Sequence, residues 1–202
     1  MKLFDTGKRK RAMNEFADQN NLIYFKKDEY GLGSYFKGFK LFGRGGAKGL
    51  THLTLNTNDS TASLQYGSFD YTFVISTGKS TMVFIQTVFF WLDQGAVLPQ
   101  FYMFPEKWYH KWGTRFFGMQ DLDFKSYPKF SDQFVLQSKD PDFTTRIFNN
   151  EPLIAELREM PKWTLECEGY YTIMYIPAKQ QKPEDMVAIM DRGHRINTLL
   201  RS

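Results

Sequence analysis

Two aspartates separated by one residue form the most suggestive chemical pattern in this sequence. Asp121 and Asp123 lie in the segment QDLDF, where they alternate with Leu122 and Phe124. On a strand both carboxylates would point from one face, about 6.6 Å apart along the chain. Carboxylate oxygens can hold Mg²⁺ or Mn²⁺, with water completing the coordination shell. The simpler interpretation, which we favour, is an edge strand whose apolar residues Leu122 and Phe124 face the core.

The histidines give less support to a metal centre. The sequence has three, His52, His110 and His194, and no two of them share the spacing of a zinc motif such as HxxxH or HExxH. Each is therefore interpreted as a structural or solvated histidine, and we expect no metal or other cofactor.

Nucleophilic catalysis is also poorly supported. Cys167 lies between Glu166 and Glu168, and neighbouring carboxylates raise the pKa of a thiol, which disfavours a thiolate nucleophile. As the only cysteine it has no intrachain disulfide partner, and a two-cysteine zinc site is excluded. Ser131 lacks the G-x-S-x-G context of a serine hydrolase. These patterns favour a protein that is not an enzyme.

A basic tetrad near the N-terminus accounts for the net charge. The chain carries 26 Lys and Arg against 22 Asp and Glu, so that without four cations the rest is neutral. Nucleic-acid binding is therefore expected to be weak, non-specific and dependent on the tetrad. Its residues are Lys8, Arg9, Lys10 and Arg11. The simpler interpretation is the solvated start of a helix spanning about residues 8–19.

Cations and aromatic residues alternate after Pro105, which suits the first position of a helix. The helical period places Trp108 and Trp112 on one stripe, which is typical of a helix that packs on a sheet. The opposite face would be cationic and is the predicted interaction surface for another protein. Its residues are Lys107, His110, Lys111 and Arg115.

The strands that must position these groups are clearest between residues 62 and 104. Alternating apolar residues predict a strand over 62–76, whereas 81–92 is apolar on both faces, which predicts a central strand covered on both sides. The two are expected to pair as an antiparallel hairpin, with 97–104 completing a meander. In the first strand the apolar residues change from even positions, ending at Tyr66, to odd positions, beginning at Phe69. Because the side-chain period of a strand is two, this change predicts a β-bulge at Gly67–Ser68.

Helices and a second hairpin are predicted for the back half. Asp140-Pro141 begins one helix, Pro152 to Met160 forms another, and a hairpin turns at Gly169 before a last helix from Pro183 to about Leu200. The sequence therefore predicts one α+β domain over residues 1–202, with an antiparallel sheet packed by N-terminal, central and C-terminal helices. Its parts are a basic helix (1–20), a strand-rich half (21–104) and a mixed half (105–202).

Short motifs along the chain resemble an uncharacterised family of bacterial proteins. They are Leu98-Pro99-x-Phe101 with Pro105-Glu106, then Gln120-Asp121-x-Asp123-Phe124, then Pro128-x-Phe130-Ser131 and a strand ending near Leu136. The resemblance implies a shared bacterial fold but no activity and no functional residues.

The absence of a signal-peptide pattern and of any apolar run of about 18 residues predicts a cytoplasmic protein without a membrane span. The sequence alone leaves two hypotheses for function. The favoured one is a non-catalytic binding or assembly module that binds another protein. The alternative is a metal-dependent hydrolase that works through Asp121 and Asp123.

Overall fold

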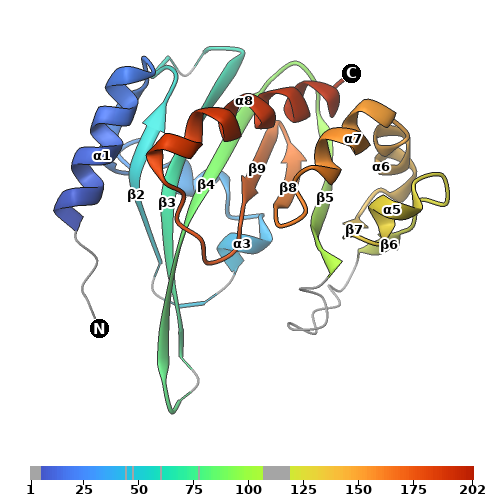
Figure 1. Cartoon of the computed structure of the whole chain (residues 1–202), viewed down its shortest axis with the longest axis horizontal. Helices are drawn as coiled ribbons and strands as arrows, with labels where there is room; N and C mark the ends of the chain where they lie inside the picture. The colour runs from blue at the N-terminus through green and yellow to red at the C-terminus, as the bar shows by residue number, and fades with distance from the viewer. Residues whose placement is uncertain (1–5, 44, 47, 60, 77, 107–118) are drawn as a thin grey trace.

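In the computed structural model, which describes residues 6–43, 45–46, 48–59, 61–76, 78–106 and 119–202, nine strands form one sheet (Figure 1). All paired neighbours are antiparallel, and the order is β1-β2-β3-β4-β9-β8-β5-β7-β6. The strands are β1 Ile23–Lys27, β2 Lys48–Leu55, β3 Leu64–Ser76, β4 Thr81–Asp93, β5 Leu98–Pro105, β6 Gln120–Leu122, β7 Phe134–Ser138, β8 Thr164–Gly169 and β9 Tyr171–Tyr175.

Helices pack against both faces of this sheet, which confirms the predicted α+β class. The described helices are α1 Thr6–Gln19, α2 Leu32–Tyr35, α3 Lys40–Gly43, α5 Pro128–Ser131, α6 Pro141–Phe148, α7 Glu151–Arg158 and α8 Pro183–Leu199. Figure 1 shows α8 crossing the middle of the sheet, with α1 beside the strands of the first half. No helix within the described residues is long and apolar enough to cross a membrane.

Each face has its own hydrophobic core, and β4 contributes to both. Phe89 and Trp91 pack in the core that includes residues of α1, α7 and α8. Val88 and Phe90 pack in the opposite core, beneath the segment that contains α2 and α3. Side chains of a strand alternate between faces, so a strand that is apolar at every position must be covered on both sides. This was the prediction for residues 81–92.

The predicted hairpin of β3 and β4 is confirmed, but the predicted bulge at Gly67–Ser68 is wrong. The register runs without interruption from Leu64↔Asp93 to Ser76↔Thr81. The apolar residues of β3 change parity because both of its faces are covered: Tyr66 packs against one core, whereas Phe69 belongs to the other. When both faces of a strand are buried, its apolar residues at even and at odd positions are all covered without an extra residue.

A bulge does occur in the neighbouring strand β2. Thr51 pairs with Asp70 and Thr54 with Ser68, so His52 and Leu53 stand opposite the single residue Phe69. His52 has a φ of 52°, in the left-handed region, which histidine adopts more readily than most residues.

The predicted meander is wrong in its last strand, because β5 does not pair with β4. The hairpin of β8 and β9 lies between them: β9 pairs with β4, and β8 pairs with β5. This hairpin buries side chains on both faces, with Met174 in one core and Ile173 in the other. A hairpin that is apolar on both faces is most stable inside a sheet, where both faces can be covered. The edges are left to the short strands β1 and β6.

Polar side chains hold the connecting segments in place. Asp140 accepts a hydrogen bond from the backbone N–H of Phe143 (3.0 Å) and so caps α6, as the sequence predicted. On the other face the buried carboxylate of Glu166 accepts the backbone N–H groups of Lys40 (2.6 Å) and Leu41 (3.1 Å) and the hydroxyl of Tyr175 (2.7 Å). This fixes α3 over the sheet.

Candidate functional site

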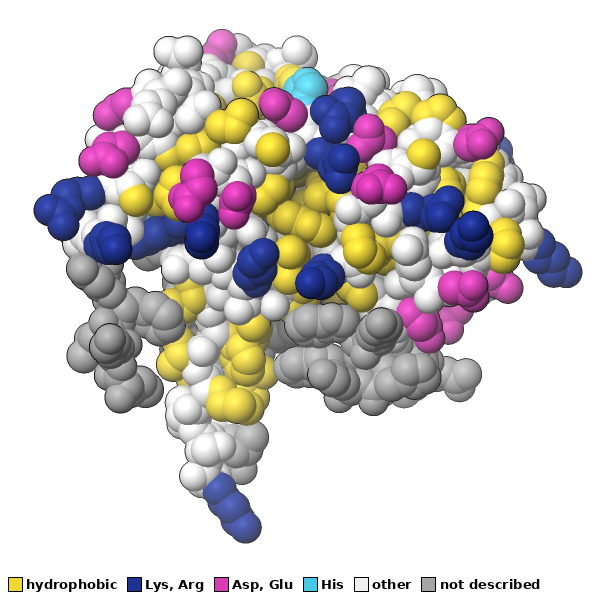
Figure 2. Space-filling view, in the orientation of Figure 1, with side chains coloured by type: hydrophobic (Ala, Val, Ile, Leu, Met, Phe, Trp, Pro, Cys, Tyr) yellow, Lys and Arg dark blue, Asp and Glu magenta, His cyan; other side chains and the backbone are white. Residues whose placement is uncertain are grey.

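A groove of about 1350 Å³ lies beside α1 and above β2, β3 and the segment that leads into α8. Its lining holds six cationic side chains against three carboxylates, a net charge of +3. The cations are Lys8, Arg9, Lys10, Lys26, Lys27 and Lys182, and the acids are Glu15, Asp70 and Glu184. Figure 2 shows lysine and arginine side chains over the lower part of α1 and below the start of α8, with hydrophobic and acidic side chains among them.

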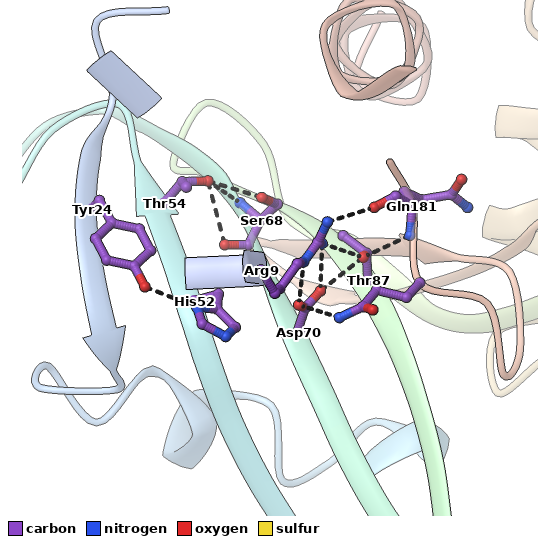
Figure 3. A network of polar contacts seen from close by, with 9 residues as sticks. Arg9, Tyr24, His52, Thr54, Ser68, Asp70, Thr87 and Gln181 are labelled. Carbon is purple, nitrogen blue, oxygen red and sulfur yellow. Dashed lines mark hydrogen bonds and ion pairs between the residues drawn. The ribbon is translucent and has the colours of Figure 1, made fainter. Parts of the chain in front are cut away.

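A buried ion pair forms the floor of this groove (Figure 3). The guanidinium of Arg9 donates to both carboxylate oxygens of Asp70, from Nε at 2.8 Å and from Nη2 at 2.9 Å. The side chain of Asp70 is 1% exposed and that of Arg9 is 14% exposed. A bidentate pair of this geometry is among the strongest polar contacts in proteins, and it fixes the position of α1 on the sheet.

Three further residues complete the hydrogen bonding of the pair. Thr87 donates its hydroxyl to Asp70 (2.8 Å), and Gln180 donates its side-chain amide to the same carboxylate (2.6 Å). Arg9 also donates to the backbone carbonyl of Gln181 (2.8 Å), whose own N–H donates to the hydroxyl of Thr87 (2.9 Å). The pair therefore ties α1, β3, β4 and the segment before α8 together.

This arrangement gives Arg9 a partner inside the protein. It was grouped with Lys8, Lys10 and Arg11 as a cation for nucleic acid, but its charge is already matched by Asp70 inside the protein. A sequence signal for this role did exist. Arg9 precedes the buried residues Met13 and Phe16 by four and seven positions, so it lies on the inward stripe of α1.

His52 lines the groove from the bulge of β2. Its Nδ1 lies 2.8 Å from the hydroxyl of Tyr24, and the two rings stack with centroids 6.1 Å apart. Burial lowers the pKa of His52 and raises the pKa of Tyr24, because the charged form of each group is poorly solvated there. The neutral imidazole is therefore the favoured form at neutral pH, and the lysines supply the positive charge of the groove.

Asp121 and Asp123 lie at the opposite edge of the sheet. Asp121 is in the edge strand β6 and accepts a hydrogen bond from the side-chain amide of Gln137 (2.7 Å), whereas Asp123 follows the end of that strand. Phe124 is buried in the core, as the simpler interpretation predicted. Within the described residues, no group of three or more His, Cys, Asp or Glu side chains gathers where a metal ion would fit.

The other candidate residues of the sequence do not line the groove or lie outside the described residues. Lys107, His110, Lys111 and Arg115 all lie outside the described residues. His194 is exposed on α8, where its ring meets the ring of Tyr66 edge-on with centroids 5.6 Å apart.

Cys167 is buried in β8 and donates to the hydroxyl of Thr172 across the hairpin (3.6 Å). Burial raises the pKa of this thiol to about 12 and is the largest cause, whereas the charge of Glu166 makes a smaller contribution in the same direction. The sequence prediction of an unreactive thiol rested on the carboxylates alone, and burial adds the stronger reason.

We expect the thiol of Cys167 to resist a disulfide reagent such as DTNB at pH 8 in the folded protein and to react fully in denaturant. Its folded pKa of about 12 lies above the ordinary value of 9.0, so the thiol contributes stability below pH 9. That contribution is lost as the pH rises from 9 towards 12. Fast modification of the native protein would contradict the buried position.

Comparisons with known proteins support the fold and no more. No family model matches the sequence, and no curated protein matches it. A similar solved structure is the crystal structure of the mycobacterial trehalose monomycolate transport factor A, TtfA, with a TM-score of 0.62. The match covers 95% of this chain and 94% of that one at 14% sequence identity. At this identity the two chains share a fold, and residue roles do not transfer.

Proposed function

We propose that this protein is a non-catalytic binding module and that the lysine-lined groove beside α1 binds an anionic ligand. The observation that carries the proposal is the convergence of cations from three separate segments on one groove. Lys8 and Lys10 come from α1, and Lys26 and Lys27 from the end of β1. Lys182 comes from the residue before α8 and forms an exposed ion pair with Glu184 at 3.7 Å. Clustered charges of one sign in a concave site attract a ligand of the opposite sign.

The floor of the groove supports this role because it is already assembled. Arg9 and Asp70 neutralise each other, and Thr87 and Gln180 add hydrogen bonds to the carboxylate. A ligand therefore meets a fixed surface and does not have to order it, which reduces the entropic cost of binding. The positive potential comes from the lysines around this floor.

The similar fold of TtfA agrees with a binding role. TtfA is named as a trehalose monomycolate transport factor, and that name describes transport and states no chemical reaction. The nature of the ligand follows from the groove of this chain.

Inorganic tripolyphosphate is a compact probe for the groove. We expect it to bind the wild-type protein and to bind the double variant Lys26→Ala, Lys27→Ala about tenfold more weakly, since each exposed ion pair contributes roughly 0.2–1 kcal/mol. Isothermal titration calorimetry at low salt measures both affinities. The folded state should change little, because both lysines are exposed.

A matched control separates the groove from the net charge. The double variant Lys125→Ala, Lys129→Ala removes the same charge from two exposed lysines that do not line the groove. It should bind tripolyphosphate within twofold of the wild type. An equal loss in both double variants would show that only net charge matters, and the proposed function would then fail.

A further inference from the structure

The groove is larger than a small anion requires. Its volume of about 1350 Å³ exceeds the roughly 300–1,000 Å³ that is typical of small-molecule sites. Its cations also come from three separate segments, which are α1, the end of β1 and the residue before α8. This distribution suits a ligand that carries several negative charges along its length.

The groups between the lysines suit a peptide backbone. The side-chain amides of Asn20 and Gln180 already donate to the carbonyl of Phe16 and to Asp70, but the side chains of Gln19, Thr51 and Thr72 also line the groove. These groups both donate and accept hydrogen bonds, as the N–H and C=O groups of an extended peptide require. From this chemistry we infer that the occupant is an acidic, extended segment of another protein. The inference rests on the proposed function and names its ligand class.

The same lining disfavours two other polyanions. Single-stranded nucleic acid is usually held by exposed aromatic rings on which its bases stack, and the two rings that line this groove, Phe16 and His52, are buried. A membrane surface is usually met by a continuous apolar face. Among the apolar residues of the groove only Val187 is a large exposed side chain, at 41%.

The inference is tested by fluorescence anisotropy with a labelled twelve-residue peptide of alternating Glu and Ser. We expect this peptide to bind the wild-type protein at least tenfold more tightly than its Gln-Ser counterpart. Affinity should fall about tenfold in Lys26→Ala, Lys27→Ala and stay within twofold in Lys125→Ala, Lys129→Ala. A twelve-residue oligothymidylate and phosphatidylglycerol vesicles are the competing probes.

A variant that narrows the groove distinguishes an extended ligand from a compact one. Val187→Trp adds volume at an exposed lining position and changes no charge. It should weaken the binding of the Glu-Ser peptide at least fivefold and leave the affinity for tripolyphosphate within twofold of the wild-type value. An equal loss of affinity for both probes would show that the groove does not bind an extended ligand along its length.

The outcomes separate this inference from the proposed function. Groove-dependent binding of tripolyphosphate without tighter binding of the peptide overturns the inference and leaves an anion-binding module. Groove-dependent binding of oligothymidylate or vesicles in preference to the peptide assigns the groove to nucleic acid or to a membrane. If the loss of Lys26 and Lys27 changes the affinity for none of the probes, both the proposed anion-binding groove and the proposed peptide ligand are wrong.

Discussion

Replacing Asp70 with alanine should lower the free energy of unfolding by about 3–5 kcal/mol, because the guanidinium of Arg9 would remain largely buried without its carboxylate. Thr87 and Gln180 would also lose the acceptor that they now share. Denaturation in guanidinium chloride, monitored by tryptophan fluorescence, measures the change. The exposed aspartate Asp191 on α8 gives a matched control, and Asp191→Ala should cost less than about 0.5 kcal/mol.

A double variant shows whether the cost arises from the unpaired charge. Arg9→Met combined with Asp70→Leu removes both ions and keeps apolar volume at both positions, so it should recover much of the stability that Asp70→Ala loses. A loss below about 1 kcal/mol for Asp70→Ala would mean that Arg9 finds water once its partner is gone. The ion pair would then not be what fixes α1.

Truncating Phe36 to alanine should cost about 3–5 kcal/mol, because the side chain is fully buried at the centre of the core beneath α2 and α3. The ring of Phe36 contacts five other aromatic rings, with centroids 5.5–5.8 Å away: Phe39, Phe42, Phe69, Phe90 and Tyr171. Removing it leaves a cavity bounded by stiff side chains that collapse poorly. The same denaturation experiment measures the loss.

The preceding residue supplies the control for this truncation. Tyr35 is 56% exposed and stacks on Tyr171 from outside, so Tyr35→Ala should cost less than about 1 kcal/mol. Similar losses in the two variants would indicate that the segment of α2 and α3 contributes little to stability. Its aromatic residues would then serve a purpose other than packing.

Local patterns in the sequence were enough to predict most elements of the fold. The Asp140 cap, the hairpin at Gly169 and the last helix from Pro183 all appear where propensity and spacing placed them. The strand order was not predictable in this way, since nothing in residues 94–97 indicates that β5 passes two strands before it joins the sheet. Pairing between distant strands depends on which faces are finally covered.

The parity change in β3 shows the same limit. A change from even to odd apolar positions has two physical explanations, an inserted residue or a strand buried on both faces. The first was predicted near Gly67, and the second is what occurs, because the segment of α2 and α3 covers the second face of β3. Because α2 and α3 are short and lie in a glycine-rich tract, the sequence gave little indication that this segment covers the sheet.

The groove was beyond sequence reasoning for a related reason. Lys26, Lys27 and Lys182 are unremarkable surface lysines in the sequence, and only the packing of α1 and α8 on one face brings them together. Arg9 could have been recognised from its place on the stripe of Met13, and Asp70 from its charge within an apolar strand. The predicted surface of residues 107–115 stays a prediction.

The place of the β8–β9 hairpin affects how the chain assembles during synthesis. Strands β1 to β4 and strands β5 to β7 form two groups, and they join in one sheet only through residues 164–175. A nascent chain that has left the ribosome up to β7 can pair β4 with β3 and β5 with β7, but one edge of each of these inner strands, Thr81–Asp93 and Leu98–Pro105, still lacks its partner. Both strands carry apolar side chains on both faces. Unpaired strand edges of this kind can form hydrogen bonds with strands of other chains and so lead to aggregation. A chaperone that holds these two strands until the last quarter of the chain emerges would protect the protein at its most vulnerable stage.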